Sequence, residues 1–494
     1  MSLSVSSARR QNAGLLLVLY ALLVFALFPG RFDADSVLQY YQGIIFNFFD
    51  WLSPLMALLL GILHAIARGP APMFVVQLTL YSIGVLLLSD SMIVSGHIHS
   101  GPATTLLMLA PIVSFNFLSV QKDALFCALI VLAMGAFARS IVAPKPLTIV
   151  KAIFWIGVLT LLWDLRKNSL FMLVPICFGV AYFIFRVQSP IIKAWAVAGL
   201  LFVGSYMLRE VLVYRVLPTG RGYALTSVIL FDLAGISHRL NKDVSSGVVG
   251  ADFVADAHKC YTEHSADNLM PWGLCKSRGL LLQQEFGTSQ GEHAAIRAWL
   301  KAIVQHPFAY AAHRWAYFAS LMRISCSRCT EPMNIGVRIK RPYGIWQPNV
   351  PLDFSEPERV TVLGLLFERL AMMSYQSPWS WGFGWMIILA AGMIAAGVRL
   401  RRGEFDQFEL LMAIASVSGF LYGAGFLFVG VSDAQWYLHV VYALGLLTVC
   451  LMLRYTSRVL RPMILPTGPF KLPSGLRTRL GKTHSDESRD ISTL

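Results

Sequence analysis

The sequence predicts an all-α polytopic membrane protein with about ten transmembrane helices. Of its 494 residues, 56% are hydrophobic and only 14% are charged, whereas about a quarter of the residues in a typical soluble domain are charged. The hydrophobic residues are concentrated in long runs, and the basic residues lie at the ends of those runs. No globular core could bury so many apolar side chains, so lipid must surround much of the chain.

The apolar runs number eleven, and each is a candidate for a membrane-crossing helix. They cover residues 13–29, 53–67, 73–89, 103–118, 124–141, 150–164, 170–186, 193–213, 380–398, 408–430 and 435–453. Both termini are basic and are expected in the cytoplasm, which requires an even number of crossings. The run at 53–67 is the weakest because it covers only about 15 residues, fewer than a bilayer needs. We therefore predict that this run forms a juxtamembrane or re-entrant helix and that the other ten cross.

This topology divides the chain into four parts. Residues 1–213 form an N-terminal transmembrane module with a first outer loop at 30–72. Residues 214–375 form a long non-cytoplasmic loop region, and residues 376–456 form the C-terminal transmembrane helices. Residues 457–494 form a basic cytoplasmic tail, which is expected to be disordered because it is polar and rich in Pro and Gly.

The net charge of +14 does not indicate a nucleic-acid-binding protein. The basic residues lie at helix ends, as in "RLRRGEF" at 399–405. This distribution follows the positive-inside rule and is favoured by anionic lipid on the cytoplasmic face. We expect membrane lipids, and not nucleic acid, as partners.

The long outer region is expected to contain amphipathic helices, and it holds more than half of the cysteines of the chain. Residues 291–323 have apolar side chains at helical spacing, with a break at Pro307, and are expected to lie at the outer membrane–water boundary. The region also holds four of the seven cysteines, which are Cys260, Cys275, Cys326 and Cys329. An even number of cysteines in an oxidising compartment predicts at least one disulfide, first of all Cys260–Cys275.

The first outer loop carries the strongest sign of chemistry, the pair Asp33 and Asp35. They lie at the start of an amphipathic helix whose apolar stripe is Val37, Tyr40, Tyr41, Ile44 and Phe48. Two carboxylates just outside the membrane can serve as a general base and as a metal or sugar ligand. The alternative is that Asp35 or Ser36 only caps the helix and that Asp33 is an ordinary loop residue.

Further charges lie on the same side of the membrane in two short outer loops. Lys122 and Asp123 lie in "SVQKDALF", and Arg166 and Lys167 lie in "WDLRKNSLF". Each alone could be a flanking residue that reaches the interface. Together they indicate a site that pairs carboxylates with cations, which suits a phosphate-bearing ligand. Asp232, in "FDLAGISHRL" at the start of the long outer region, is a weaker candidate.

These motifs together resemble the GT-C glycosyltransferase fold. The shared features are an acidic motif after the first span, an outer juxtamembrane helix pair, an acid opening a later span and a long outer loop. "DADSVLQYYQG", "QKDALFCALIVLA", "DLRKNSL", "FDLAGIS" and "SDAQWYLHVVYALGL" look like segments of bacterial membrane glycosyltransferases that modify lipopolysaccharide O-antigen or other envelope glycans. The resemblance implies a GT-C-like architecture with outer juxtamembrane helices and one long periplasmic loop region.

The resemblance also implies a reaction, the inverting transfer of a sugar from a polyprenyl-phosphate carrier to a glycan or lipid-linked acceptor. The reaction would take place on the periplasmic face of the bacterial inner membrane. Asp35 is the expected base, positioned by Asp33 or Asp123. A divalent metal, Mg or Mn, is a possible cofactor, because some members of the group use one and others do not. The expected substrate-binding residues are Lys122, Arg166, Lys167, Asp232, Arg314 and Tyr437.

The sequence departs from the pattern of this group at two points. Leu52 follows Trp51 where such proteins often have a His-Pro pair. Near the last span, Gln435 and Tyr437 follow Asp433 where an Asp-x-Arg-Tyr arrangement is common. Without that arginine, Arg314 or Lys122 is expected to supply the positive charge.

Three other classes of protein are alternatives. A secondary transporter or lipid flippase would show internal repeats and broken helices at the bilayer midplane, but the sequence shows no repeat. An O-antigen polymerase or ligase would depend on His306 and Arg314 and would not need Asp35. A structural assembly protein would need none of these residues.

Overall fold

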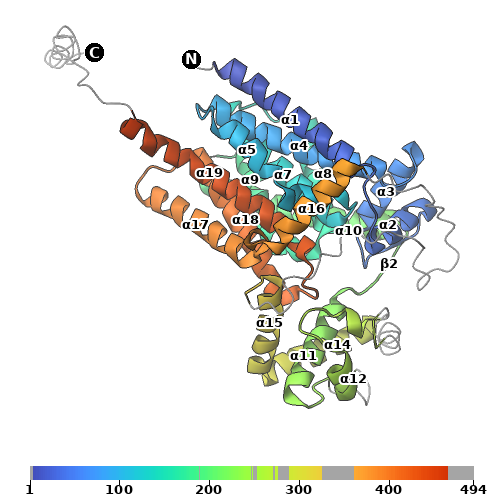
Figure 1. Cartoon of the computed structure of the whole chain (residues 1–494). Helices are drawn as coiled ribbons and strands as arrows, with labels where there is room; N and C mark the ends of the chain where they lie inside the picture. The colour runs from blue at the N-terminus through green and yellow to red at the C-terminus, as the bar shows by residue number, and fades with distance from the viewer. Residues whose placement is uncertain are drawn as a thin grey trace, which may run out of the picture. The chain divides into compact units, whose positions relative to one another are not determined.

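The computed structural model describes residues 4–188, 190–245, 248, 253–270, 273–275, 289–324 and 361–464. The chain divides into two compact units, Met1–Met452 and Leu453–Leu494. Within the described residues, the second unit contains only the last turns of the final helix. The following description concerns the first unit, which is almost entirely helical where it is described (Figure 1).

All ten runs expected to cross the membrane form helices or broken helices. They are α1 (Val5–Leu27), α4 (Ala71–Val94), α5 (Ser100–Met108) with α6 (Pro111–Ser114) and η1 (Phe115–Leu118), α7 (Lys122–Val142), α8 (Ile149–Leu165), α9 (Leu170–Gly179) with η3 (Val180–Ile184), α10 (Ile191–Val211), α17 (Gly382–Arg401), α18 (Gln407–Val429) and α19 (His439–Ile464). Of the described helices, eight are long and apolar enough to cross a bilayer, or nine if the bent pair around residue 110 is one span. The chain is thus an all-α polytopic membrane protein, as predicted.

Two of the expected elements differ from a simple straight span. The run at 103–118 is a helix pair bent by 44° and not a single helix. The bend lies at Pro111, which cannot donate a backbone hydrogen bond to the preceding turn. The run at 53–67 forms α3 (Pro54–Ile66), whose 13 residues are fewer than a crossing needs. It packs against α2 (Ala34–Ile45), the helix of the first outer loop.

Glycines allow a close contact between the helices α4 and α7. A Cβ added to Gly135 would lie 2.3 Å from the carbonyl oxygen of Gly84. One added to Gly84 would lie 2.7 Å from the backbone nitrogen of Leu132. Small residues at such crossings let two helices in a membrane approach until their backbones touch.

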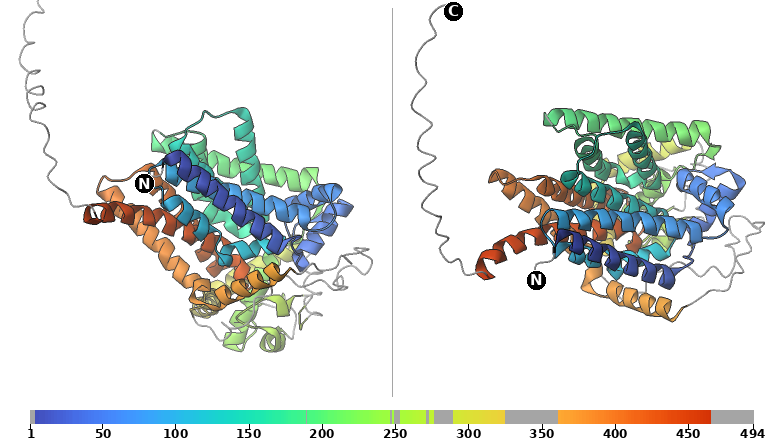
Figure 2. Two further views of the ribbon diagram at one scale, coloured as in Figure 1. Left: turned by 45° about the horizontal axis from the view of Figure 1, so that its top comes forward. Right: turned by 90° about the horizontal axis from the view of Figure 1, so that it is seen from above.

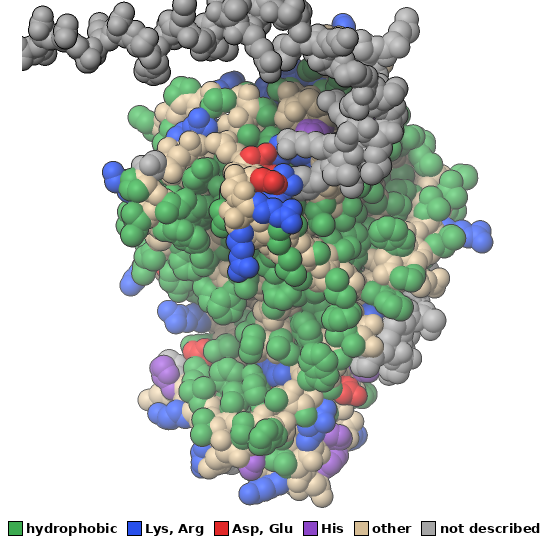
Figure 3. Space-filling view, turned by 90° about the vertical axis from the view of Figure 1, so that its left-hand side faces the viewer, with side chains coloured by type: hydrophobic (Ala, Val, Ile, Leu, Met, Phe, Trp, Pro, Cys, Tyr) green, Lys and Arg blue, Asp and Glu red, His purple; other side chains and the backbone are tan. Residues whose placement is uncertain are grey.

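The surface of the helix bundle is apolar, as a lipid-facing surface requires. Ile149, Leu200 and Ile394 are 80%, 73% and 67% exposed. Exposed apolar area of this kind is rare on soluble monomers. On the face in Figure 3, apolar side chains predominate and charged side chains gather in a few groups. The long helices run beside one another in both views of Figure 2.

The long outer region contains a helical lobe between α10 and α17. Its helices are α11 (Leu225–Leu240), α12 (Phe253–Cys260), α14 (Ser289–Gln305) and α15 (Pro307–Leu321). The helix pair predicted at 291–323, with its break at Pro307, is therefore confirmed. A further helix, α16 (Val362–Gln376), packs against α1 and α6.

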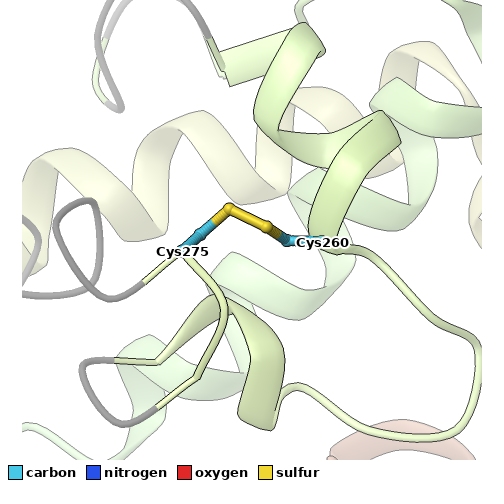
Figure 4. The surroundings of a disulfide bond; sticks show 2 residues. All are labelled: Cys260 and Cys275. Atoms are coloured by element: carbon cyan, nitrogen blue, oxygen red, sulfur yellow. A yellow bond between two sulfur atoms is a disulfide. The ribbon is translucent and has the colours of Figure 1, made fainter.

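A disulfide bond joins Cys260, at the end of α12, to Cys275 (Figure 4). This is the pairing that the sequence analysis places first. Cys326 and Cys329 lie outside the described residues. Cys127, Cys177 and Cys450 are buried free thiols.

Candidate active site

The segments expected on the outer side of the membrane meet at one end of the helix bundle. The backbone nitrogen of Val120 donates a 2.8 Å hydrogen bond to the carbonyl oxygen of Arg31, which joins the first outer loop to the start of α7. An ion pair between Arg166 and Asp123 joins the loop after α8 to the same place. The guanidinium carbon of Arg166 lies 4.5 Å from the ring centroid of Tyr437, which adds the segment before α19. Four loops distant in sequence thus form one polar site.

Asp33 caps α2. Its Oδ1 accepts hydrogen bonds from the backbone nitrogen of Ser36, at 2.7 Å, and from the Ser36 hydroxyl. Its Oδ2 accepts from the side-chain amide of Gln121. The alternative that Asp35 or Ser36 caps the helix is therefore wrong. Burial, and next the negative charge of Asp35, raise the pKa of Asp33 to about 6 although Ser36 acts in the opposite direction.

Asp35 is the second residue of α2 and has a different environment. Its Oδ2 lies 2.6 Å from Nζ of Lys122, and its side chain is 54% exposed. The surrounding protein raises the pKa of Asp35, but the charges of Lys122 and Arg166 outweigh this effect and hold the pKa below its usual value. Among the described residues, none bonds to Oδ1 of Asp35. An ionised carboxylate oxygen is thus available to a ligand.

Asp123 is engaged with Arg166 in a buried ion pair. The two side chains are only 7% and 10% exposed, and burial of this degree makes loss of either partner costly. The pair fixes the guanidinium over Tyr437, whose ring also stacks on Phe426 at 5.7 Å. The cation that contacts the Tyr437 ring is therefore Arg166.

Lys167 contacts a second polar cluster around Asp50. Its Nζ donates to the carbonyl oxygen of Asp50 at 2.6 Å and lies 3.9 Å from the Asp50 carboxylate. That carboxylate also accepts from the Tyr214 hydroxyl and the backbone nitrogen of Gly222. These contacts attach strand β1 (Phe48–Phe49) to its parallel partner β2 (Thr219–Gly220). This cluster could not be predicted from the sequence because its members come from three separate segments.

Asp232 and Arg314 bind each other in the interior of the lobe. Oδ1 of Asp232 lies 2.6 Å from Nε of Arg314 and 3.0 Å from Nε2 of His313, and Oδ2 accepts from the indole of Trp299 at 2.7 Å. Nη1 of Arg314 donates to the carbonyl oxygen of Gly430 at 2.6 Å. Burial lowers the pKa of His313, which keeps it neutral, despite the nearby Asp232. The structure thus places Asp232 and Arg314 where they attach the lobe to the end of α18.

Among the described residues, no group of three His, Cys, Asp or Glu side chains has an arrangement that could hold a metal ion. The ammonium group of Lys122 is the cation beside Asp35, and both oxygens of Asp33 accept hydrogen bonds from the protein.

Comparisons with known proteins give one structural match. No protein-family model matches the chain, and no curated protein matches it. The crystal structure of ArnT from Cupriavidus metallidurans bound to undecaprenyl phosphate is similar to it with a TM-score of 0.29 and 12% sequence identity. The match covers 90% of this chain and 77% of that chain.

Proposed function

We propose that the chain is an inverting glycosyltransferase. It moves a sugar from a polyprenyl-phosphate carrier to lipopolysaccharide O-antigen or another envelope glycan, on the periplasmic face of the bacterial inner membrane. One observation supports this above all. The ionised, half-exposed Asp35 lies beside Lys122, and Arg166 lies over Tyr437 close by, at the end of a bundle with an apolar surface.

The base in this reaction is Asp35. A hydroxyl group of the acceptor is a poor nucleophile, so a carboxylate must take its proton as the oxygen attacks the anomeric carbon. The new bond forms between that oxygen and the anomeric carbon, and the bond from the carbon to the phosphate oxygen breaks. Attack opposite the leaving group inverts the configuration. Oδ1 of Asp35, to which no described residue bonds, is the atom that accepts the proton.

Fixed cations stabilise the leaving group. The leaving group is a lipid phosphate, which needs positive charge more than it needs a proton. Lys122 and Arg166 supply this charge, and the buried Asp123 holds Arg166 in place. The polyprenyl tail requires an apolar surface, which the exposed side chains of the bundle provide.

Two alternative functions agree less well with the site. A polymerase or ligase would use Arg314 on its substrate, but that side chain is 2% exposed and binds Asp232 and Gly430. A transporter would place its ionisable groups near the bilayer midplane. Asp33, Asp35 and Lys122 lie instead at the ends of their helices.

Comparison of envelope glycans by mass spectrometry tests this proposal. The bacterium that encodes the chain is grown with and without the gene. The proposal expects a mass difference of one sugar per glycan repeat or per acceptor molecule. Transfer by the purified protein in EDTA, compared with transfer after Mg²⁺ or Mn²⁺ is added back, decides whether the reaction needs a divalent metal. Identical envelope glycans in the two strains would contradict the proposal.

A further inference from the structure

The disulfide-closed loop, residues 260–275, docks against the turn that precedes the last span. The backbone nitrogen of Ala266 donates to the carbonyl oxygen of Val431 at 2.7 Å, and that of Asp433 donates to the carbonyl oxygen of His264 at 2.9 Å. Between them, Ser265 and Ser432 form an antiparallel bridge. This loop therefore lies against the segment that leads to Tyr437.

Three side chains from distant parts of the chain meet at this junction. Oδ2 of Asp433 accepts a 2.6 Å hydrogen bond from the Ser320 hydroxyl and lies 3.0 Å from Nδ1 of His264. The His264 and Asp433 side chains are 24% and 32% exposed. Among the described residues, none bonds to Oδ1 of Asp433 or to Nε2 of His264. Two polar atoms of this partly exposed cluster are thus not used by any described residue.

This Ser, His and Asp set is not arranged as a catalytic triad. In a triad the imidazole lies between the hydroxyl and the carboxylate and uses a different nitrogen for each. Here the same nitrogen, Nδ1 of His264, faces both groups, at 2.8 Å from Ser320 and 3.0 Å from Asp433. Ser320 donates directly to the carboxylate, so nothing removes its proton. This geometry suits hydrogen bonding to a ligand and does not suit nucleophilic attack by Ser320.

The cluster borders the candidate active site. Asp433 precedes Tyr437 closely in the chain, and the guanidinium carbon of Arg166 lies 4.5 Å from the Tyr437 ring centroid. Asp267 belongs to the disulfide-closed loop and is exposed. Tyr317, which donates to the carbonyl oxygen of Ser432 at 2.9 Å, is within electrostatic range of both Asp433 and Tyr437.

We propose that His264, Ser320 and Asp433 form the acceptor subsite, which binds hydroxyl groups of the sugar that receives the transferred residue. This inference rests on the proposed function. A sugar hydroxyl is both donor and acceptor, so it can donate to Oδ1 of Asp433 while its neighbour bonds to Nε2 of His264. The negative charges of Asp433 and Asp267 repel a phosphate. The cations Lys122 and Arg166 thus favour the donor, and the acids Asp433 and Asp267 favour a neutral polyol.

Substitution of Asp433 and His264 tests the subsite. Asp433→Asn retains an oxygen that accepts from Ser320, so the loop should stay docked while the carboxylate charge is lost. His264→Gln removes the imidazole. The matched control is Glu263→Gln, an exposed neighbour in the same loop that pairs with Arg239 at 3.8 Å. Free-thiol counting and thermal unfolding establish that each full-length variant keeps the Cys260–Cys275 bond and the wild-type stability.

The measurement is the initial rate of sugar transfer as a function of acceptor concentration. The probe is a glycolipid extract from the strain that lacks the gene, titrated at fixed donor. We expect the KM for the extract to rise about tenfold or more in Asp433→Asn and His264→Gln, because each variant loses a group that hydrogen-bonds the acceptor hydroxyls. The kcat and the KM for the donor should stay within about twofold, which marks loss of ground-state acceptor binding. Glu263→Gln should behave as wild type.

Two results would overturn the subsite. A wild-type KM for the extract in a well-folded Asp433→Asn protein would show that the acceptor does not bind there, and this isosteric variant decides alone if His264→Gln does not fold. An equal rise in the donor KM would assign the cluster to the donor. Failure of the proposed function looks different, because the wild-type protein itself would then transfer no sugar.

Discussion

Asp33 and Asp35 both lie at the start of α2 but have opposite environments. Asp33 is partly buried and accepts hydrogen bonds through both oxygens, and its pKa is raised to about 6. Asp35 is half exposed and pairs with Lys122, and its pKa is lowered. Neighbouring carboxyl groups whose pKa values are moved apart are a common way to divide roles within a site. We assign proton transfer to Asp35 and its positioning to Asp33.

Protonation of Asp33 should produce an acid limb in the pH profile of kcat/KM near pH 6. As the pH falls through about 6, Asp33 gains a proton and its negative charge disappears. That charge increases the proton affinity of Asp35, so its loss makes Asp35 a weaker base and slows transfer. Asp33→Asn retains the helix cap but has no titrating group. Its acid limb should therefore move to lower pH, and an unchanged limb would contradict the assignment.

Some residues of the site could be predicted from the sequence and others could not. Asp33, Asp35, Lys122, Asp123 and Arg166 were predicted because helix ends on one side of a membrane must lie near one another. The side chains of Arg166 and Lys167 reach different clusters because of the local backbone conformation. Arg166 is extended, with φ −142° and ψ 106°, between α8 and the 3₁₀ turn η2 (Lys167–Ser169), and consecutive side chains of extended backbone point in opposite directions.

At the scale of helices, hydropathy predicts where a helix lies in the sequence better than it predicts whether that helix is unbroken. The ten runs expected to cross coincide with helices, since each apolar segment must satisfy its backbone within itself in lipid. The bend between α5 and α6 was missed, because an apolar run containing a proline remains an apolar run. The contact of His264 with Asp433 joins residues 169 positions apart, and no local pattern encodes such a pairing.

The crossing of α4 and α7 should not tolerate a side chain at Gly135. In Gly135→Ala the new Cβ would lie 2.3 Å from a backbone oxygen, which cannot move aside as a flexible side chain could. Overpacking of this kind costs about 1 to 3 kcal/mol. Thermal unfolding in detergent should show a clearly lower Tm. Gly157→Ala on α8 is the matched control, because no atom lies within 4 Å of its added Cβ, and equal Tm values for the two variants would disprove the close contact.

At the scale of the whole molecule, charged clusters mark the two ends of the bundle. At one end Asp90 pairs with Arg9 at 2.5 Å and with Arg139 at 2.9 Å, which joins α1, α4 and α7. At the opposite ends of these helices lie Asp33, Lys122 and their partners. The excess of Arg around Asp90 is typical of the cytoplasmic side. The acidic site is therefore expected on the periplasmic side.

Cysteine labelling from outside the membrane tests this orientation. Lys301→Cys, on the exposed side of α14, should react with an impermeant thiol reagent added to intact spheroplasts. Arg402→Cys, at the end of α17, should react only after the membrane is opened. The wild-type protein, treated in the same way, gives the background labelling of the native cysteines. Labelling of residue 402 in intact spheroplasts without labelling of residue 301 would show that the orientation is the opposite of the expected one.

The central claim, sugar transfer with Asp35 as its base, is tested most directly by the turnover of purified Asp35→Asn protein. Asp33 caps α2, so this change should leave the fold and the binding of polyprenyl phosphate intact. Asp406→Asn is the matched control, because it alters an aspartate that caps α18. We expect the control to match wild type and Asp35→Asn to lose about two to four orders of magnitude in turnover, the usual contribution of a positioned base. Near-normal transfer by well-folded Asp35→Asn protein would contradict the claim.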